Sequence, residues 1–119
     1  MAEIKDDSDI INSTVPKVVV NAKNEAIFLS RSPIPYPKKN RLKFFKQVCI
    51  YVFTKNSLKQ FSELPQGPIE NAEDIEILRF IENRMLVRMV KVDDVPIAVD
   101  TPSDLELVRR IISERINKQ

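Results

Sequence analysis

Residues 15–30 read VPKVVVNAKNEAIFLS and carry the clearest fold signal in the chain. Residues 15–20 are rich in β-branched side chains, which favour strands, and residues 26–30 are apolar enough to form a returning strand. The polar residues 21–25 between them are typical of a turn. The stretch therefore predicts a β-hairpin with a longer loop.

Downstream of the hairpin, the pattern alternates between strands and helices. Three prolines in residues 32–40 favour a stiff, extended run. The last helix is expected to have Thr101 as its cap and Pro102 at its first position. Its expected buried stripe is Leu105, Val108, Ile112 and Ile116. The other expected elements are a strand covered on both faces at 48–53, a short helix at 56–64, one long amphipathic helix at 69–85, and strands at 86–92 and 96–99.

Strands separated by helices predict an α/β fold with a mixed sheet flanked by helices. A chain of 119 residues holds one compact domain. We expect residues 1–14 to be loosely ordered and residues 15–119 to form the folded unit. The few strands would leave a sheet edge unprotected, which indicates a missing partner layer.

The composition is that of an ordinary soluble globular protein, with 43% apolar and 30% charged residues. No run approaches the roughly 20 apolar residues of a membrane helix. The first ten residues mix charges of both signs and do not resemble a signal peptide. A lone Cys49 fits a reducing compartment, so we expect a cytoplasmic protein without a membrane partner.

Missing residue types exclude several kinds of chemistry. The chain has no histidine, which excludes histidine-activated nucleophiles and histidine-ligated zinc. Gly67 is the only glycine, so the chain has no glycine-rich phosphate loop. The net charge of +2 is too small for a typical nucleic-acid binder, and the basic residues 38–46 are better explained as a solvated loop or an arm that reaches a partner.

Two residues next to predicted strands could bind a ligand. Arg31 follows a strand and precedes the proline-rich run, and its planar fork suits a carboxylate or phosphate. An exposed loop arginine is the commoner explanation. Tyr51 could offer its hydroxyl to a ligand, although a tyrosine in an apolar strand more often belongs to the core.

Acidic residues supply two further candidates. Four acidic residues open the predicted helix at 69–85, where the helix dipole favours them and a solvated face explains most of them. Glu76 is the exception, because it borders the apolar stripe. Asp100 ends a predicted strand, where a carboxylate can bind Mg²⁺, and it also fits a simple helix cap. The spacing favours both interpretations of Asp100 equally.

An ordered set of motifs resembles the 3-deoxy-manno-octulosonate cytidylyltransferases, over residues 17–110. Each motif alone is weak, whereas their order along the chain is specific for the family. The motifs are KVV at 17–19, FLSRSPIP at 28–35, IY at 50–51, PIE at 68–70, Glu73, EILR at 76–79 and VDTPSDL at 99–105.

The resemblance implies a fold similar to the carboxyl-terminal half of a nucleotide-diphospho-sugar transferase, which is Rossmann-like. It also implies that the anomeric hydroxyl of an acidic sugar attacks the α-phosphorus of CTP and releases pyrophosphate, with Mg²⁺ offsetting the phosphate charge. Asp100 would then bind Mg²⁺ as the catalytic residue. Arg31 would pair with the sugar carboxylate, and Tyr51 and Glu76 would hold sugar hydroxyls.

Departures from the family pattern limit what the resemblance implies. The family's glycine-rich nucleotide-binding segment and its second magnesium aspartate do not occur in this sequence. Gln47 stands where the family carries a histidine in the sugar pocket, and Ile77 stands where a glutamine is common. Glutamine still donates a hydrogen bond but carries no charge, so the sugar could differ.

Two hypotheses therefore remain open. In the first, the chain is the sugar-binding and dimerisation half of a cytidylyltransferase, inactive alone and expected to form a homodimer. In the second, it is a non-catalytic dimerisation or interaction module derived from that fold. Nucleic-acid binding rests only on the basic residues 38–46 and is not expected.

Overall fold

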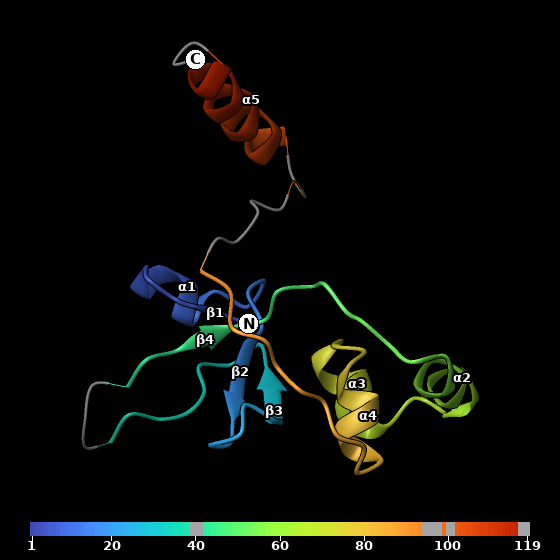
Figure 1. The fold of residues 1–119 in the computed structure, drawn as a ribbon. Helices are drawn as coiled ribbons and strands as arrows, with labels where there is room; N and C mark the ends of the chain where they lie inside the picture. The colour runs from blue at the N-terminus through green and yellow to red at the C-terminus, as the bar shows by residue number, and fades with distance from the viewer. Residues whose placement is uncertain (39–41, 94–98, 100–101, 117–119) are drawn as a thin grey trace.

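The computed structural model describes residues 1–38, 42–93, 99 and 102–116. Its elements form a four-stranded sheet of order β1-β4-β2-β3 accompanied by helices (Figure 1). The α/β class predicted from the sequence is confirmed, and the strand pairings found in the described residues are all antiparallel rather than mixed. The strands are β1 Ala2–Glu3, β2 Lys17–Val20, β3 Ala26–Ser30 and β4 Phe45–Lys46. The helices are α1 Asp7–Ile11, α2 Lys55–Glu63, α3 Pro68–Glu73, α4 Leu78–Glu82 and α5 Pro102–Ile116.

The predicted hairpin is confirmed as β2 and β3. Lys17 pairs with Ser30 in the antiparallel register, and the ladder shifts by a bulge between Val19 and Val20. Asn24 closes the turn with φ of 58°, a left-handed conformation that asparagine tolerates better than most residues. The hairpin fixes the position at which Ser30 and the following Arg31 leave the sheet.

The prediction of one long helix at 69–85 is wrong, because the structure has two shorter helices there, α3 and α4. Asp74 adopts φ 53° and ψ 49°, which ends α3 in the left-handed conformation common at helix carboxyl ends. Ile75 and Leu78 are nevertheless buried. The helical spacing of apolar residues therefore reflects core burial on both sides of a tight break.

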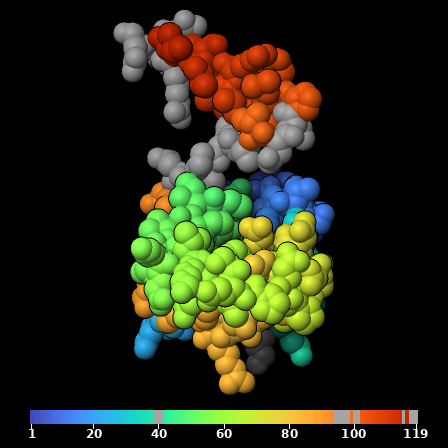
Figure 2. All heavy atoms as spheres, turned by 90° about the vertical axis from the view of Figure 1, so that its right-hand side faces the viewer, coloured from blue at the N-terminus to red at the C-terminus, as the bar shows by residue number. Residues whose placement is uncertain are grey.

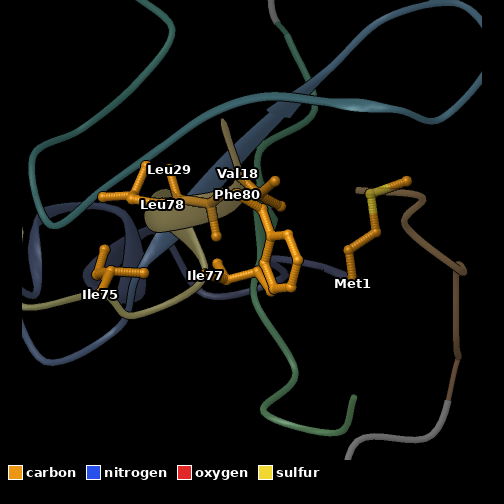
Figure 3. Packing of buried hydrophobic residues seen from close by; sticks show 7 residues of the cluster. All are labelled: Met1, Val18, Leu29, Ile75, Ile77, Leu78 and Phe80. Atoms are coloured by element: carbon orange, nitrogen blue, oxygen red, sulfur yellow. The ribbon is translucent and has the colours of Figure 1, made fainter. Parts of the chain in front are cut away.

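A single core joins the hairpin to α4. Val18 and Leu29 from the hairpin pack with Leu78 and Phe80 from α4, and Figure 3 shows these side chains together with Met1, Ile75 and Ile77. Met1 is buried, where residues 1–14 were expected to be loosely ordered. The amino-terminal segment instead forms β1 and α1, and Asp6 caps α1 by accepting from the Ser8 amide at 2.9 Å.

Two of the predicted strands do not form. Residues 48–53 are irregular, with Ile50 72% and Val52 95% exposed. Residues 86–92 make only one isolated bridge, between Glu25 and Arg88. An apolar run becomes a strand only beside a neighbour that completes its ladder, and the described residues supply none for residues 48–53. Residues 86–92 do meet neighbours, through backbone bonds such as Met89 N to Asn24 O at 2.7 Å and Val92 N to Met1 O at 2.9 Å, but these do not add up to a regular ladder. The predicted strand at 96–99 lies mostly outside the described residues.

The helices predicted at 56–64 and from Pro102 are confirmed as α2 and α5, whereas Thr101 lies outside the described residues. The predicted burial of the α5 stripe is wrong, because α5 stands apart from the sheet and from the other helices (Figures 1 and 2). Ile112 is 51% and Ile116 67% exposed. No helix in the described part of the chain is both long and apolar enough to cross a membrane.

Candidate functional site

The end of β3 is fastened to the end of α3 by Glu73. Its carboxylate accepts from the Ser30 hydroxyl at 2.5 Å and from the Arg31 amide at 2.8 Å. The Ser30 hydroxyl in turn accepts from the Ser32 amide at 3.0 Å. These bonds hold the backbone at Arg31, where the chain leaves the sheet for the proline-rich run.

The guanidinium of Arg31 makes three hydrogen bonds to backbone carbonyls. Its Nε donates to Glu73 O at 2.6 Å, and its terminal nitrogens donate to Ser13 O and Asp74 O, both at 3.0 Å. An ion pair with the Asp74 carboxylate spans 3.6 Å, and the Arg31 side chain remains 35% exposed. Arg31 thus binds the carboxyl end of α3, and its role toward a sugar carboxylate stays a prediction.

Lys17 contacts the backbone at Arg31 and is fully buried. Its ammonium donates to Asn12 O at 2.8 Å and to Arg31 O at 2.5 Å. Burial lowers the pKa of Lys17, and the nearby carboxylate of Glu73 acts in the opposite direction. Lys17 therefore fixes the carbonyl of Arg31 from inside, while Glu73 fixes its amide.

A buried ion pair joins α3 to α4. Arg79 donates to both carboxylate oxygens of Glu70, at 2.7 and 2.5 Å, and the Glu70 side chain is only 3% exposed. The Arg79 guanidinium also lies 4.2 Å from the centre of the Phe61 ring. Hydrogen bonds from Arg79 hold the pKa of Glu70 below its usual value. The expectation of a solvated acidic face is thus wrong for Glu70.

Gln47 and Tyr51 form a polar pair in otherwise apolar surroundings. The Gln47 side-chain amide donates a short hydrogen bond to the Tyr51 hydroxyl oxygen. Gln47 Oε1 is buried and has no hydrogen-bond partner among the described residues. An unpaired buried acceptor is costly, so this atom is prepared to accept a donor from a ligand.

Tyr51 remains protonated over the ordinary pH range. Burial raises the pKa of Tyr51 to about 12, and the charges of Cys49 and Glu76 act in the same direction. Two of the predicted site residues, Gln47 and Tyr51, are in direct contact, whereas a place for Glu76 beside them stays a prediction.

An apolar groove of about 840 Å³ adjoins the Gln47–Tyr51 pair. Residues 47–54, except Cys49, form one wall, and residues 85–90 with Val92 form another. Leu29, Ile77 and Phe80 of the core also line it. The rings of Tyr51, Phe53 and Phe80 stack in series along it, with centroids 6.0 and 5.7 Å apart.

Asp100, the predicted magnesium ligand, lies outside the described residues. Among the residues that the structure describes, no three histidine, cysteine or carboxylate side chains come together in a way that could hold a metal ion. Magnesium binding by Asp100 therefore stays a prediction.

Sequence reasoning missed the supporting contacts of Lys17 and Glu73. Lys17 is the first residue of the otherwise apolar strand Lys17–Val20, where a charged residue beside buried positions is a signal for a buried polar contact. Glu73 gives no such signal, because its partners Ser30 and Arg31 are more than 40 residues away in sequence. Only the folded hairpin brings these groups together.

Comparisons with known proteins match this geometry to one family. A family model described as cytidylyltransferase matches residues 1–92. The 3-deoxy-manno-octulosonate cytidylyltransferase of Solibacter usitatus is 38% identical over 115 residues, which cover 95% of this chain and 46% of that protein. The enzyme of the same name from Escherichia coli is 39% identical over 105 residues, covering 87% of this chain and 42% of its own length.

A solved structure supports the same relationship. The structure of CMP:2-keto-3-deoxy-manno-octonic acid synthetase complexed with CTP superposes with a TM-score of 0.89 at 34% identity, covering 96% of this chain and 47% of the other. The chain therefore spans about half the length of the relatives that it matches. With a family model that covers most of its residues, this chain belongs to the cytidylyltransferase family.

Proposed function

We propose that this chain supplies the sugar-binding half of an enzyme that transfers CMP from CTP to an acidic sugar of the 3-deoxy-manno-octulosonate type and releases pyrophosphate. The relatives that share 38% and 39% identity carry that enzyme name. The observation that carries the proposal is the hydrogen-bonded pair of Gln47 and Tyr51, both of which line the apolar groove. Because the chain has no glycine-rich phosphate loop, the CTP site belongs to the other half of the enzyme.

The Gln47–Tyr51 pair offers one donor and one acceptor, which suits a sugar hydroxyl. The Tyr51 oxygen already accepts from Gln47, so its own proton is directed elsewhere and can be donated to a ligand. Gln47 Oε1 can accept from the same or a neighbouring hydroxyl. With a pKa of about 12, Tyr51 acts as a hydrogen-bond donor rather than as a base at neutral pH.

The remaining roles follow from charge. Glu76 is an exposed carboxylate that can accept from two hydroxyls, and Arg31 is the cation assigned to the sugar carboxylate. Asp100 is assigned to Mg²⁺, which would offset phosphate charge when bound. The described residues do not by themselves fit a magnesium site, so this assignment rests on the chemistry of one carboxylate.

The direct test supplies the absent half. The nucleotide-binding half of the Solibacter usitatus relative is joined in one polypeptide with this chain, and pyrophosphate release is measured with CTP, Mg²⁺ and 3-deoxy-manno-octulosonate. We expect release that requires the sugar, with a higher KM for the sugar in Tyr51→Phe and no change in Tyr36→Phe, whose side chain is exposed. A folded fusion that releases no pyrophosphate with any sugar acid tried would overturn the proposal.

A second candidate function is a non-catalytic interaction module. The apolar groove favours it, because exposed apolar surface of this kind marks interaction sites. Light scattering on the chain alone distinguishes this candidate: a homodimer without any effect on CTP turnover supports it, and a strict monomer contradicts it.

We further propose a cytoplasmic location, since Cys49 is exposed and unpaired, as in a reducing compartment.

A further inference from the structure

The two backbone polar groups of Arg31 are both held by charged side chains. The Glu73 carboxylate accepts from the Arg31 amide at 2.8 Å, and the Lys17 ammonium donates to the Arg31 carbonyl at 2.5 Å. Lys17 is fully buried, and burying an ammonium costs free energy. Neutral partners would satisfy the same two backbone groups at a lower cost. The charges therefore indicate a further requirement at Arg31.

These contacts fix the direction in which the Arg31 side chain leaves the backbone. The amide and the carbonyl flank the Cα atom, so their partners restrict the two soft backbone dihedral angles of this residue. Hydrogen bonds to ionised groups are also stronger than those between neutral groups. The Ser30 hydroxyl adds to the restraint, because it donates to Glu73 at 2.5 Å and accepts from the Ser32 amide at 3.0 Å.

The guanidinium of Arg31 is held too, but only some of its donors are used. Its Nε and one N–H on each terminal nitrogen donate to backbone carbonyls. A guanidinium has five N–H groups, so two have no hydrogen-bond partner among the described residues, one on each terminal nitrogen. Two N–H groups in a fixed fork can bind both oxygens of a carboxylate.

Asp74 is the one carboxylate of the described residues that pairs with this fork. It lies 3.6 Å from a terminal nitrogen, which is longer than a hydrogen bond, and its side chain is 96% exposed. An exposed pair of this kind contributes little free energy. A ligand carboxylate can therefore displace Asp74 from Arg31.

We propose that Glu73 and Lys17 are positioning residues, which hold Arg31 in the orientation where its two remaining N–H groups receive the carboxylate of the sugar acid. This inference rests on the proposed function, because that function supplies the carboxylate. Glu73 has one oxygen on Ser30 and the other on Arg31, and Lys17 is enclosed by the fold. Both residues act through Arg31 rather than on the ligand.

A purely structural role for these contacts predicts different kinetics. Loss of folded enzyme lowers the apparent kcat and leaves the KM of the sugar acid unchanged. A misplaced Arg31 instead weakens the binding of the sugar carboxylate equally in the ground state and in the transition state. That change raises the KM of the sugar acid and leaves kcat unchanged.

The first experiment measures the kinetics of the single-polypeptide fusion that tests the proposed function. Glu73→Gln keeps the shape of the side chain and removes its charge. We expect the KM of the sugar acid to rise at least about tenfold, with kcat and the KM of CTP changed less than about twofold. Glu63→Gln is the matched control, because it neutralises an exposed glutamate on α2, and it should change none of the three values. An unchanged KM of the sugar acid in Glu73→Gln would overturn the inference.

Coupling to Arg31 separates positioning from indirect effects. The readout is kcat/KM for the sugar acid, which is measured at low sugar concentration even where binding is weak. In the natural background, Glu73→Gln and Lys17→Met should each lower it at least about tenfold. In an Arg31→Lys background, which lacks the fork, each should lower it less than about twofold. Equal losses in both backgrounds contradict the inference, because the two residues then act independently of Arg31.

Folding of the variants is checked by circular dichroism before the kinetics are interpreted. Lys17 is fully buried, so Lys17→Met is the variant more exposed to a folding defect. Glu73 is only partly buried, and Glu73→Gln carries the test by itself if Lys17→Met does not fold.

A second experiment uses the 119-residue chain alone and needs no catalysis. NMR follows the exchange of the Arg31 Nε proton with water, and the signal is assigned by its loss in Arg31→Lys. Nε donates to the backbone carbonyl of Glu73, which Glu73→Gln retains. If the carboxylate orients the side chain, exchange in Glu73→Gln should be at least about tenfold faster. Exchange at the natural rate would show that the carboxylate does not position Arg31.

The two proposals fail in different ways. A fusion that releases no pyrophosphate with any sugar acid contradicts the proposed function, and the exchange of the Arg31 Nε proton then still decides whether Glu73 positions Arg31. A fusion that turns over the sugar acid with the same KM in Glu73→Gln keeps the function and contradicts the positioning role.

Discussion

At the residue scale, the environment decides the chemistry of the groups in the candidate site. The Tyr51 hydroxyl accepts a hydrogen bond from Gln47, and burial raises the pKa of Tyr51 to about 12. The Arg31 guanidinium donates hydrogen bonds to three backbone carbonyls, which hold it in one orientation. A cation held in one orientation by its protein contacts loses little conformational entropy when a ligand binds.

Tyr51 is predicted to ionise at unusually high pH. In a Tyr36→Phe variant, Tyr51 is the only tyrosine, since the chain has two. Its tyrosinate absorbance should rise with a midpoint near 12, compared with the ordinary value of 10.0 in urea. A pKa raised by folding stabilises the fold fully below pH 10 and loses that stabilisation as the pH rises toward 12. Tyr51 is 41% exposed, so a native midpoint at 10 would show that its partial burial does not shift the hydroxyl.

The Glu70–Arg79 ion pair is predicted to matter for stability. Glu70→Ala leaves a buried guanidinium unpaired, so the free energy of unfolding should fall by about 3–5 kcal/mol in urea titrations. The matched control is Glu63→Ala in the exposed Lys59–Glu63 pair, where the loss should be below about 1 kcal/mol. Similar losses for both variants would contradict this role of the buried pair.

The same ion pair predicts a pH dependence. The pKa of Glu70 is held below its ordinary value of 4.5, so the pair contributes its full stabilisation above pH 4.5. That contribution is lost as the pH falls through the lower folded value. The fall in unfolding free energy below pH 4.5 should therefore be smaller in Glu70→Gln than in the natural sequence.

The sequence could predict the identity of the candidate site residues but not all of their contacts. Tyr51, Glu76 and Gln47 were predicted from family motifs and a departure from them. The fold brings Gln47 and Tyr51 into contact, whereas the role of Glu76 stays a prediction. The contacts of Arg31 were not predictable, because its carbonyl partners come from backbone geometry rather than from residue type. Asp100 stays a prediction.

At the element scale, the start of α3 depends on a side chain from α4. The Glu82 carboxylate accepts from the amides of Ile69 and Glu70, at 2.9 and 3.0 Å, and so caps a helix whose own cap residue is Gly67. Acids at helix amino ends are favoured by the dipole as well as by these hydrogen bonds. The cap leaves no room for a side chain at position 67.

Gly67→Ala is predicted to displace that cap. A Cβ atom at this position would lie 2.3 Å from a Glu82 carboxylate oxygen, so the carboxylate must move away from the two amides. We expect a loss of about 0.5–2 kcal/mol in unfolding free energy, typical of a lost helix cap. In a Glu82→Ala background the same substitution should cost much less, and an unchanged cost would contradict the displacement.

Elements with their partners in the chain were predictable, and elements without them were not. The hairpin has both of its strands within residues 15–30, so local pattern suffices. The break at Asp74 depends on a left-handed backbone conformation, and the sequence gives no sign of it because the residue is an aspartate rather than a glycine. Residues 48–53 carry a strand pattern but find no ladder in the described residues, which is a failure of tertiary context rather than of propensity.

At the scale of the whole molecule, α5 is predicted to add nothing to the stability of the rest. It stands apart from the sheet, and its apolar stripe is exposed. Deleting residues 102–119 should therefore change the unfolding free energy by less than about 0.5 kcal/mol, as for a surface change. The helical circular dichroism lost should be small, because a 15-residue helix is marginal alone. A large loss of stability would contradict the separation of α5.

The buried ammonium of Lys17 gives the molecule an internal reporter of its own opening. An amine-acylating reagent cannot reach a fully buried nitrogen, whereas Lys23 and Lys55 are exposed and react at once. Lys17 becomes labelled only when the hairpin separates from the segment that carries Asn12. Its labelling rate, read by mass spectrometry, therefore times a local unfolding event in the intact chain without any added probe.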